Sequence, residues 1–171
     1  MTPGSTARPL RVLHRSYGGD NSKPRPGYYS KLLALAALLR AADALDVSPE
    51  LVFINDGPMP QERLRVMEKW GEVVPVRRGG SDSRSYREML NDEDARNGEP
   101  DDLLWLAEDD YLYLPDALRN LVAGAAAQPD ADYFTLYGSR AVDPARSVCW
   151  AWNGGSRRSA ELFLLGAYKA R

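Results

Sequence analysis

Short apolar runs alternate along this chain with longer segments in which apolar residues recur every three or four positions. Runs of about four to eight apolar residues are typical of strands, whereas a recurrence of about 3.6 residues is typical of helices. The runs predict strands at 10–14, 51–54, 73–76, 103–107 and 133–137. The periodic segments predict four helices. The first covers 28–45, the second begins near residue 60, the third ends near residue 96, and the fourth covers 115–127. This alternation predicts an α/β fold, with a Rossmann-like, mostly parallel sheet flanked by helices.

The two ends of the chain follow other patterns. Residues 1–9 carry no apolar run, and we expect them to form a disordered leader. Apolar segments at 148–152 and 162–168 flank Asn153-Gly154-Gly155, which predicts a C-terminal antiparallel hairpin or a longer glycine-containing turn. Residues 10–171 are enough to enclose one hydrophobic core, so we expect a single domain.

The strand at 103–107 runs directly into three carboxylates, Glu108, Asp109 and Asp110. An unbroken apolar run is typical of a strand buried on both faces, and ligands of open α/β sheets bind at the carboxyl ends of the strands. Clustered carboxylates suit Mg²⁺ or Mn²⁺, which proteins commonly hold together with the oxygens of a substrate diphosphate. The alternative is that the triplet complements the dipole of the next helix, but Asp116 already fills that position. The triplet therefore predicts a divalent metal site.

Asp56 closes a different strand, at 51–54, and is followed by Gly57. Asp-Gly is a common turn pair, so a purely structural carboxylate is one interpretation. The other is a carboxylate that accepts a hydrogen bond from a ribose hydroxyl or a base N–H. The position of Asp56, at the same predicted edge of the sheet as the triplet, favours the second interpretation.

A cluster of arginines lies around a Gly-Gly pair and a predicted helix start: Arg77, Arg78, Arg84 and Arg87. Taken singly, each is typical of a solvated surface. As a group they indicate an anion-binding corner, because guanidinium groups and helix N-termini both bind phosphate oxygens. Together with the triplet, Asp56 and the basic loop at 18–27, they predict a pocket for a nucleoside diphosphate.

Composition narrows the classes of function. The net charge of −2 provides no basic field of the kind that collects nucleic acid, so nucleic acid is not an expected partner. Cys149 is the single cysteine and His14 the single histidine, which excludes an internal disulfide and suits oxygen-ligated chemistry in a reducing compartment. The start of the chain lacks the apolar core of a signal peptide, and no apolar stretch reaches the roughly 18 residues of a membrane span. We expect a soluble, cytoplasmic protein.

The order of these parts is familiar. A strand runs into Asn55-Asp56-Gly57, and a buried strand ends in Glu108-Asp109-Asp110, followed by a segment, 111–118, with an apolar and aromatic pattern. Over residues 10–140 the chain resembles glycosyltransferases with the GT-A fold, especially the family 2-like enzymes, in which the acidic triplet corresponds to the DXD motif. The resemblance lies in the order and spacing of the motifs more than in any one of them.

The resemblance implies transfer of a sugar from a nucleoside diphosphate donor to an acceptor hydroxyl, by a domain that binds nucleotide sugars. By matching position, Asp110 would hold Mn²⁺ or Mg²⁺, with Glu108 as a further ligand from the same motif. Asp109 would contact the metal or the donor ribose, and Asp56 the nucleoside. The remaining donor-binding candidates would face the base and phosphates: His14, Arg15, Tyr17 and Arg84. For His14, a packed imidazole is the alternative.

The chain departs from the family pattern near its end. Such transferases use a carboxylate as general base toward the acceptor, and it follows the metal motif in the chain. Glu161 and Asp143 are the acidic residues after Asp132, and neither lies in a recognisable base motif. Three alternatives remain: the base belongs to a C-terminal acceptor region absent from this sequence, Glu161 serves as base, or the chain is a non-catalytic nucleotide-sugar-binding domain. The resemblance indicates neither the acceptor nor the oligomeric state.

Overall fold

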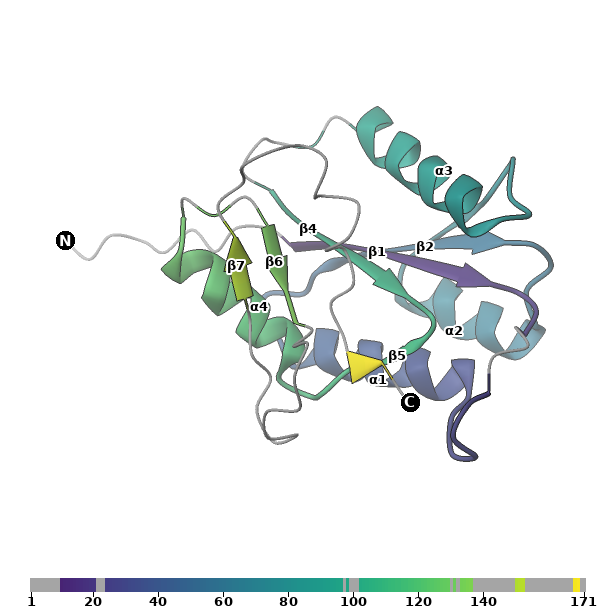
Figure 1. Ribbon diagram of the computed structural model, residues 1–171, viewed down its shortest axis with the longest axis horizontal. Helices are drawn as coiled ribbons and strands as arrows, with labels where there is room; N and C mark the ends of the chain where they lie inside the picture. The colour runs from purple at the N-terminus through teal and green to yellow at the C-terminus, as the bar shows by residue number, and fades with distance from the viewer. Residues whose placement is uncertain are drawn as a thin grey trace.

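Four parallel strands form the sheet at the centre of the computed structural model (Figure 1). The structure describes residues 10–20, 24–96, 98, 102–129, 131, 133–136, 150–152 and 168–169, the last two segments as backbone only. The four strands are β1 (Leu10–Tyr17), β2 (Glu50–Asp56), β3 (Glu72–Pro75) and β4 (Leu103–Glu108). Their order across the sheet is β3-β2-β1-β4. The predicted α/β class and parallel sheet are confirmed.

Four helices flank this sheet: α1 (Lys31–Asp43), α2 (Gln61–Trp70), α3 (Asp82–Ala95) and α4 (Ala117–Ala127). Helices α1, α2 and α4 lie on one face and α3 lies on the other (Figure 1). The larger core lies on the first face, where Leu38 of α1, Met67 of α2 and Leu118 of α4 are fully buried. The smaller core lies under α3 and contains Met89. None of the helices among the described residues is both long and apolar enough to cross a membrane.

Capping serines decide where two of the helices begin. Helix α1 begins after Ser30, later than predicted, because the Ser30 hydroxyl accepts a hydrogen bond from the Leu33 N–H at 3.0 Å. Ser81 caps α3 in the same way and accepts from the Arg84 N–H at 3.4 Å. Both serines therefore satisfy N–H groups that the first helical turn leaves without an internal partner.

Strand β1 continues beyond its apolar run, which was predicted to end at His14, through Arg15 and Ser16 to Tyr17. In the register of the sheet, Arg15 lies opposite Glu108 of β4, and Tyr17 lies opposite Asp56 of β2. The strand can end in polar residues because their side chains find polar partners across the sheet.

The chain adds strands first on one side of β1 and then on the other. From β1 the chain moves outward through β2 to β3, and then crosses through α3 to β4 on the other side of β1. Because crossovers between parallel strands are right-handed, this reversal places α3 on the opposite face from α1 and α2. The carboxyl ends of β1 and β4 therefore form a topological switch point, the place where open α/β sheets leave a crevice for ligands.

Two small antiparallel pairs complete the described structure. Strand β5 (Tyr111–Leu112) pairs with β8 (Tyr168–Lys169), and β6 (Tyr133–Thr135) pairs with β7 (Trp150–Trp152). The described parts of the two segments predicted to form a C-terminal hairpin therefore pair with other strands. The turn expected between them at 153–155 and the leader at 1–9 lie outside the described residues.

Candidate functional site

The three carboxylates at the end of β4 point into three different environments. Side chains alternate between the faces of a strand, so Glu108 lies on the α3 face with Leu106, and Asp109 lies on the opposite face. Asp110 follows in a turn and lines a cleft. Adjacent positions in the sequence thus reach separate partners, and each carboxylate pairs with a different cation.

Glu108 forms an ion pair with Arg15 on the α3 side of the sheet. Arg15 also donates a hydrogen bond to the Ser85 hydroxyl at 2.9 Å and to the Asp82 carbonyl at 3.3 Å, both in the first turns of α3. This arrangement connects β1, β4 and α3. Neither Glu108, predicted as a metal ligand, nor Arg15, predicted as a donor contact, lies among the residues that line the cleft, because the two side chains pair with each other on the α3 side. Their roles stay predictions.

Asp109 is a buried anchor whose side chain is only 11% exposed. Its carboxylate accepts hydrogen bonds from the Ser16 hydroxyl at 3.0 Å and the Tyr17 N–H at 2.9 Å, and lies 2.9 Å from the Lys31 ammonium. Burial alone would raise the pKa of Asp109, but the charge of Lys31 and these hydrogen bonds outweigh it and lower the pKa. Asp109 is therefore a structural carboxylate, with the charged form favoured by its partners, and its predicted contact with a metal or ribose stays a prediction.

Two buried cations hold the loop that follows β1. Lys31 donates to the carbonyls of Tyr17 at 2.9 Å and Gly19 at 2.8 Å. Arg63, from α2, donates to the carbonyls of Tyr17 at 3.2 Å and Gly18 at 2.8 Å. The sequence interpretation missed both cations. In the sequence, each is a charged residue at a helix position that faces the core. Such a position indicates a buried ion pair only once a buried partner such as Asp109 is known.

His14 is part of the core. It is 2% exposed, and its ring packs edge-on against Phe53 with 5.7 Å between ring centroids. Burial lowers the pKa of His14 to about 4, so the imidazole is neutral at pH 7. His14 takes the packed position that was the alternative to facing a donor, because strand alternation turns it toward the interior with Val12.

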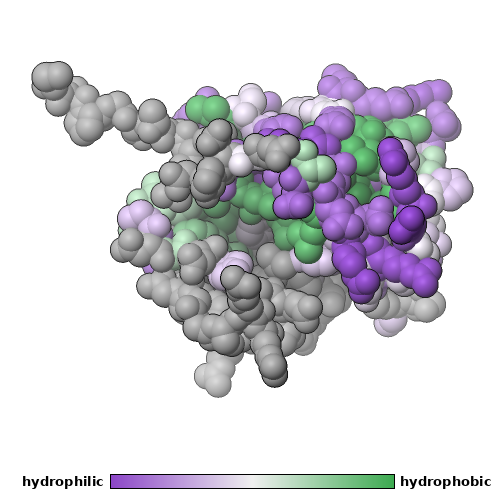
Figure 2. All heavy atoms as spheres, turned by 90° about the horizontal axis from the view of Figure 1, so that it is seen from above, coloured by the Kyte–Doolittle hydropathy of each residue, from purple (hydrophilic) through white to green (hydrophobic). Residues whose placement is uncertain are grey.

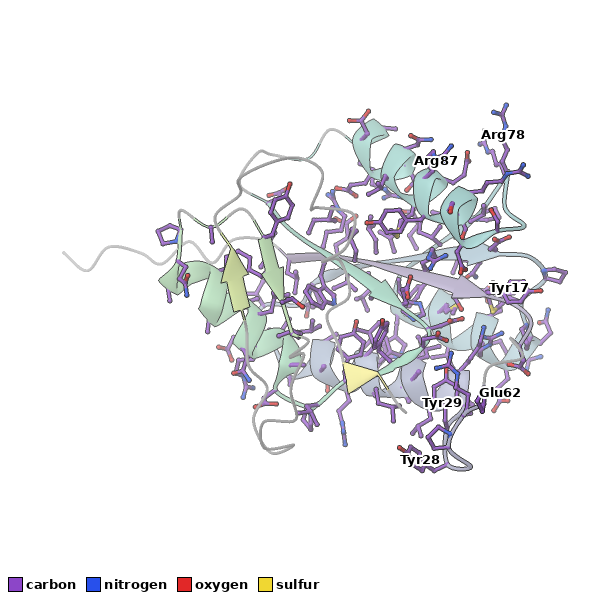
Figure 3. All side chains as sticks on the ribbon, viewed as in Figure 1. Tyr17, Tyr28, Tyr29, Glu62, Arg78 and Arg87 are labelled. Carbon is purple, nitrogen blue, oxygen red and sulfur yellow. The ribbon has the colours of Figure 1, made fainter. Side chains whose placement is uncertain are left out.

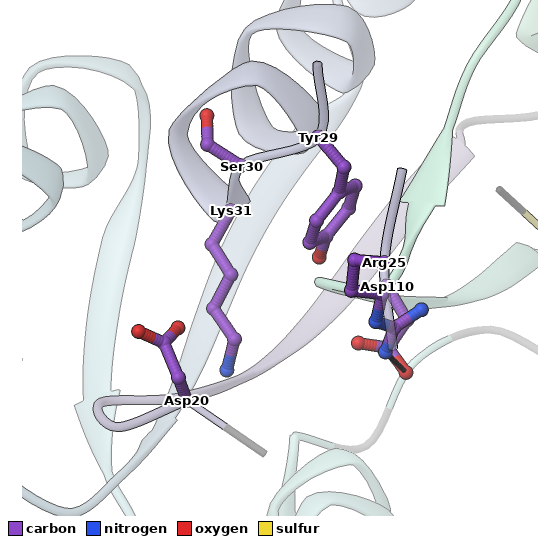
Figure 4. A pocket seen from close by; sticks show the side chains of 6 residues that line it. All are labelled: Asp20, Arg25, Tyr29, Ser30, Lys31 and Asp110. Atoms are coloured by element: carbon purple, nitrogen blue, oxygen red, sulfur yellow. Dashed lines mark ion pairs between the residues drawn. The ribbon is translucent and has the colours of Figure 1, made fainter. Parts of the chain in front are cut away.

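A cleft of about 260 Å³ opens at the switch point beside the N-terminus of α1. Its lining residues are Asp20, Arg25, Tyr29, Ser30, Lys31 and Asp110 (Figure 4). The basic loop expected near the ligand does reach this position, through Arg25. Asp110 is the one residue of the acidic triplet that lines the cleft.

Arg25, Tyr29 and Asp110 form one wall of the cleft. The Arg25 guanidinium lies 2.5 Å from the Asp110 carboxylate and stacks over the Tyr29 ring, 5.0 Å from its centroid. The Tyr29 hydroxyl donates to the Asp109 carbonyl at 2.6 Å, and burial raises the pKa of Tyr29 to about 12. Tyr29 is therefore a fixed, neutral surface against which Arg25 rests.

Asp56 lies at the same sheet edge, one strand away from the cleft. Its carboxylate accepts a hydrogen bond from the Gly80 N–H at 3.2 Å. A Cβ atom at Gly79 would lie 1.8 Å from the Asp56 Oδ1, so this approach requires a residue without a side chain. Asp56 thus holds the β3–α3 loop, as in the structural interpretation, while Tyr17 opposite it exposes half of its surface.

The four arginines of the predicted anion corner are exposed: Arg77, Arg78, Arg84 and Arg87. Seen from the α3 side, hydrophilic side chains gather at the end of the molecule that carries the β3–α3 loop (Figure 2). Arg78 and Arg87 lie on the α3 side of the sheet, whereas Tyr28 and Tyr29 lie on the α1 side (Figure 3). Arg84 is not among the residues that line the cleft.

The donor set of the cleft fits a divalent cation only in combination with a ligand. Within the described part of the chain, no group of three His, Cys, Asp or Glu side chains is arranged to hold a metal. Asp110 supplies one hard carboxylate, and Mg²⁺ is commonly bound by one or two carboxylates together with substrate phosphates and water. In the structure this carboxylate is paired with the Arg25 guanidinium.

No protein-family model matches the chain, and no curated protein matches it. The GT-A resemblance, the metal and the sugar donor therefore stay predictions. Glu161, the candidate general base, lies outside the described residues.

Proposed function

We propose that the cleft at the carboxyl ends of β1 and β4 binds a nucleoside diphosphate sugar together with Mn²⁺ or Mg²⁺, and that the protein transfers the sugar to an acceptor hydroxyl. One observation carries the proposal: Asp110, the last residue of the acidic triplet, lines a cleft at the topological switch point of the sheet. A GT-A architecture is part of this proposal, supported by the order of motifs and by the strand order β3-β2-β1-β4.

In this proposal Asp110 is the protein ligand of the cation. When bound, the cation would neutralise the negative charge that develops on the diphosphate as the glycosidic bond breaks. Asp109, Lys31 and Arg63 hold Asp110 in place, because they fix the end of β1 to the turn that follows β4, and Lys31 also lines the cleft. A rigid support of this kind is what a binding carboxylate requires to keep its geometry.

Tyr17 and Asp56 are suited to the nucleoside. Tyr17 is 50% exposed and lies opposite Asp56 in the register of the sheet, so its ring offers an aromatic surface on which a base can stack. The Asp56 carboxylate accepts one hydrogen bond from the Gly80 N–H. A carboxylate can accept about four hydrogen bonds, so further acceptor sites remain. A ribose hydroxyl can therefore be added without breaking the loop contact.

Calorimetry with GDP and UDP, each with and without Mn²⁺, tests the site. We expect metal-dependent binding to the wild type and loss of that binding in Asp110→Asn, which keeps the size of the side chain and removes its charge. Glu68→Gln is the matched control, because it removes one negative charge from the exposed side of α2. Equal Mn²⁺-dependent affinity in the wild type and Asp110→Asn would exclude the proposed site. Donor hydrolysis or sugar transfer then separates an enzyme from a binding domain.

A further inference from the structure

The Arg25–Asp110 contact occupies the carboxylate that the proposed function assigns to the metal. The two side chains lie 2.5 Å apart, and each is only 15% exposed. A guanidinium at this distance competes directly with a divalent cation for the same oxygen atoms. Asp110 is therefore blocked for a free cation as long as Arg25 stays in place.

Arg25 makes a second contact, with the Tyr29 ring, that does not involve Asp110. Its guanidinium rests over the Tyr29 ring, and the backbone of its loop is tied to the start of α1 by a hydrogen bond from the Tyr29 N–H to the Pro26 carbonyl at 2.9 Å. Tyr29 is itself held by the Asp109 carbonyl. The guanidinium can therefore change its oxygen partner while the aromatic surface keeps it inside the cleft.

A diphosphate offers such a partner. Guanidinium groups bind phosphate and carboxylate oxygens with the same forked geometry. Ser30 and Lys31, at the N-terminus of α1, line the same cleft as Arg25, together with Asp20. An anion that enters here meets Arg25 and gives it an alternative to Asp110.

We propose that Arg25 keeps Asp110 closed to divalent cations until a nucleoside diphosphate draws the guanidinium away, so that cation and diphosphate bind cooperatively. This inference rests on the proposed function and adds a positioning residue that controls access to its metal ligand. It differs from a permanent structural ion pair in one respect. Removal of Arg25 increases the affinity of Asp110 for a cation in the absence of nucleotide.

The experiment measures Mn²⁺ binding without catalysis, from the electron paramagnetic resonance signal of free Mn²⁺, with no nucleotide and with saturating GDP or UDP. In the wild type we expect weak Mn²⁺ binding that nucleotide strengthens. In Arg25→Gln we expect affinity for Mn²⁺ alone to rise about tenfold or more, the range for loss of a competing charge-assisted hydrogen bond. The strengthening by nucleotide should shrink, and by linkage the strengthening of nucleotide binding by Mn²⁺ should shrink by the same factor.

Two variants keep the result interpretable. Arg25→Lys retains the charge but loses the fork, so its affinity for Mn²⁺ alone should lie between those of the wild type and Arg25→Gln, and it carries the test if Arg25→Gln fails to fold. Arg65→Gln is the matched control, since Arg65 is exposed on α2, two positions from Arg63 and on another side of the helix. Its Mn²⁺ affinity and nucleotide coupling should equal those of the wild type.

The outcomes separate the two proposals. If the wild type binds Mn²⁺ with nucleotide through Asp110 but neither Arg25→Gln nor Arg25→Lys changes the affinity for Mn²⁺ alone, the inference about Arg25 is overturned and the proposed function stands. If Asp110→Asn binds Mn²⁺ and nucleotide as the wild type does, the proposed site is overturned, and the role of Arg25 is overturned with it.

Discussion

Substitution of Asp109 by alanine should destabilise the protein far more than the same change at Asp110. Asp109→Ala removes the partner of Lys31 and the nearest negative charge to Arg63, whose side chains are each 8% exposed. Breaking a buried ion pair from one side costs about 3 to 5 kcal/mol, because the remaining charge stays buried. Lys31 keeps the carbonyls of Tyr17 and Gly19, which places the expected loss at the lower end, about 3 kcal/mol.

Asp110→Ala removes a single ion pair that lines the cleft, and Arg25 keeps its contact with the Tyr29 ring, so we expect a loss of about 1 kcal/mol. Urea unfolding at pH 7, followed by tryptophan fluorescence, measures both values with the wild type in parallel. The double variant Asp109→Ala with Lys31→Met should recover part of the loss, because it leaves one fewer uncompensated charge. A loss below about 1 kcal/mol for Asp109→Ala would refute the role of Asp109 as the anchor of the β1–β4 edge.

Two further predictions concern stability. The pKa of His14 falls from 6.5 to about 4 on folding, so as the pH drops the unfolded chain takes up a proton first and the native state loses about 3 kcal/mol between these two pH values. His14→Phe should flatten this slope in urea unfolding over the same pH range, and an unchanged slope would contradict the assignment. Gly79→Ala should cost about 1 kcal/mol or more, because its Cβ displaces the Asp56 carboxylate from the Gly80 N–H. Gly27→Ala, where a Cβ meets nothing within 4 Å, should stay within about 0.5 kcal/mol, and thermal melts of both variants give the comparison.

The fold class followed from local pattern, and so did the positions of the main strands. Apolar runs at 51–54 and 103–107 lie within β2 and β4, as expected because short apolar runs favour strands that pack against a core. The expected position of the acidic triplet at a strand end is also confirmed. The end of β1 was placed too early, because Arg15 and Ser16 continue the pairing with β2 and their side chains have polar partners in Glu108 and Asp109.

The pattern placed candidate side chains at one edge of the sheet, but it did not determine which of them line a common cleft. Asp110 lines the cleft and the basic loop reaches it, whereas Glu108, Arg15 and His14 lie elsewhere. Each of these three residues stands on a strand whose period of two sends neighbouring side chains to opposite faces. Which face of the sheet lines the cleft depends on where the helices pack, and the sequence of the strand does not determine that packing.

The sequence by itself determined the alternation of strands and helices and the cluster of carboxylates at the end of β4, because both depend on residue types close together in the chain. The tertiary structure decided what each carboxylate does. Asp109 meets Lys31 and Arg63 in the interior, while Asp110 meets Arg25 in the cleft. These pairs join residues that are distant in sequence, and the energy of an ion pair depends on separation and burial in space.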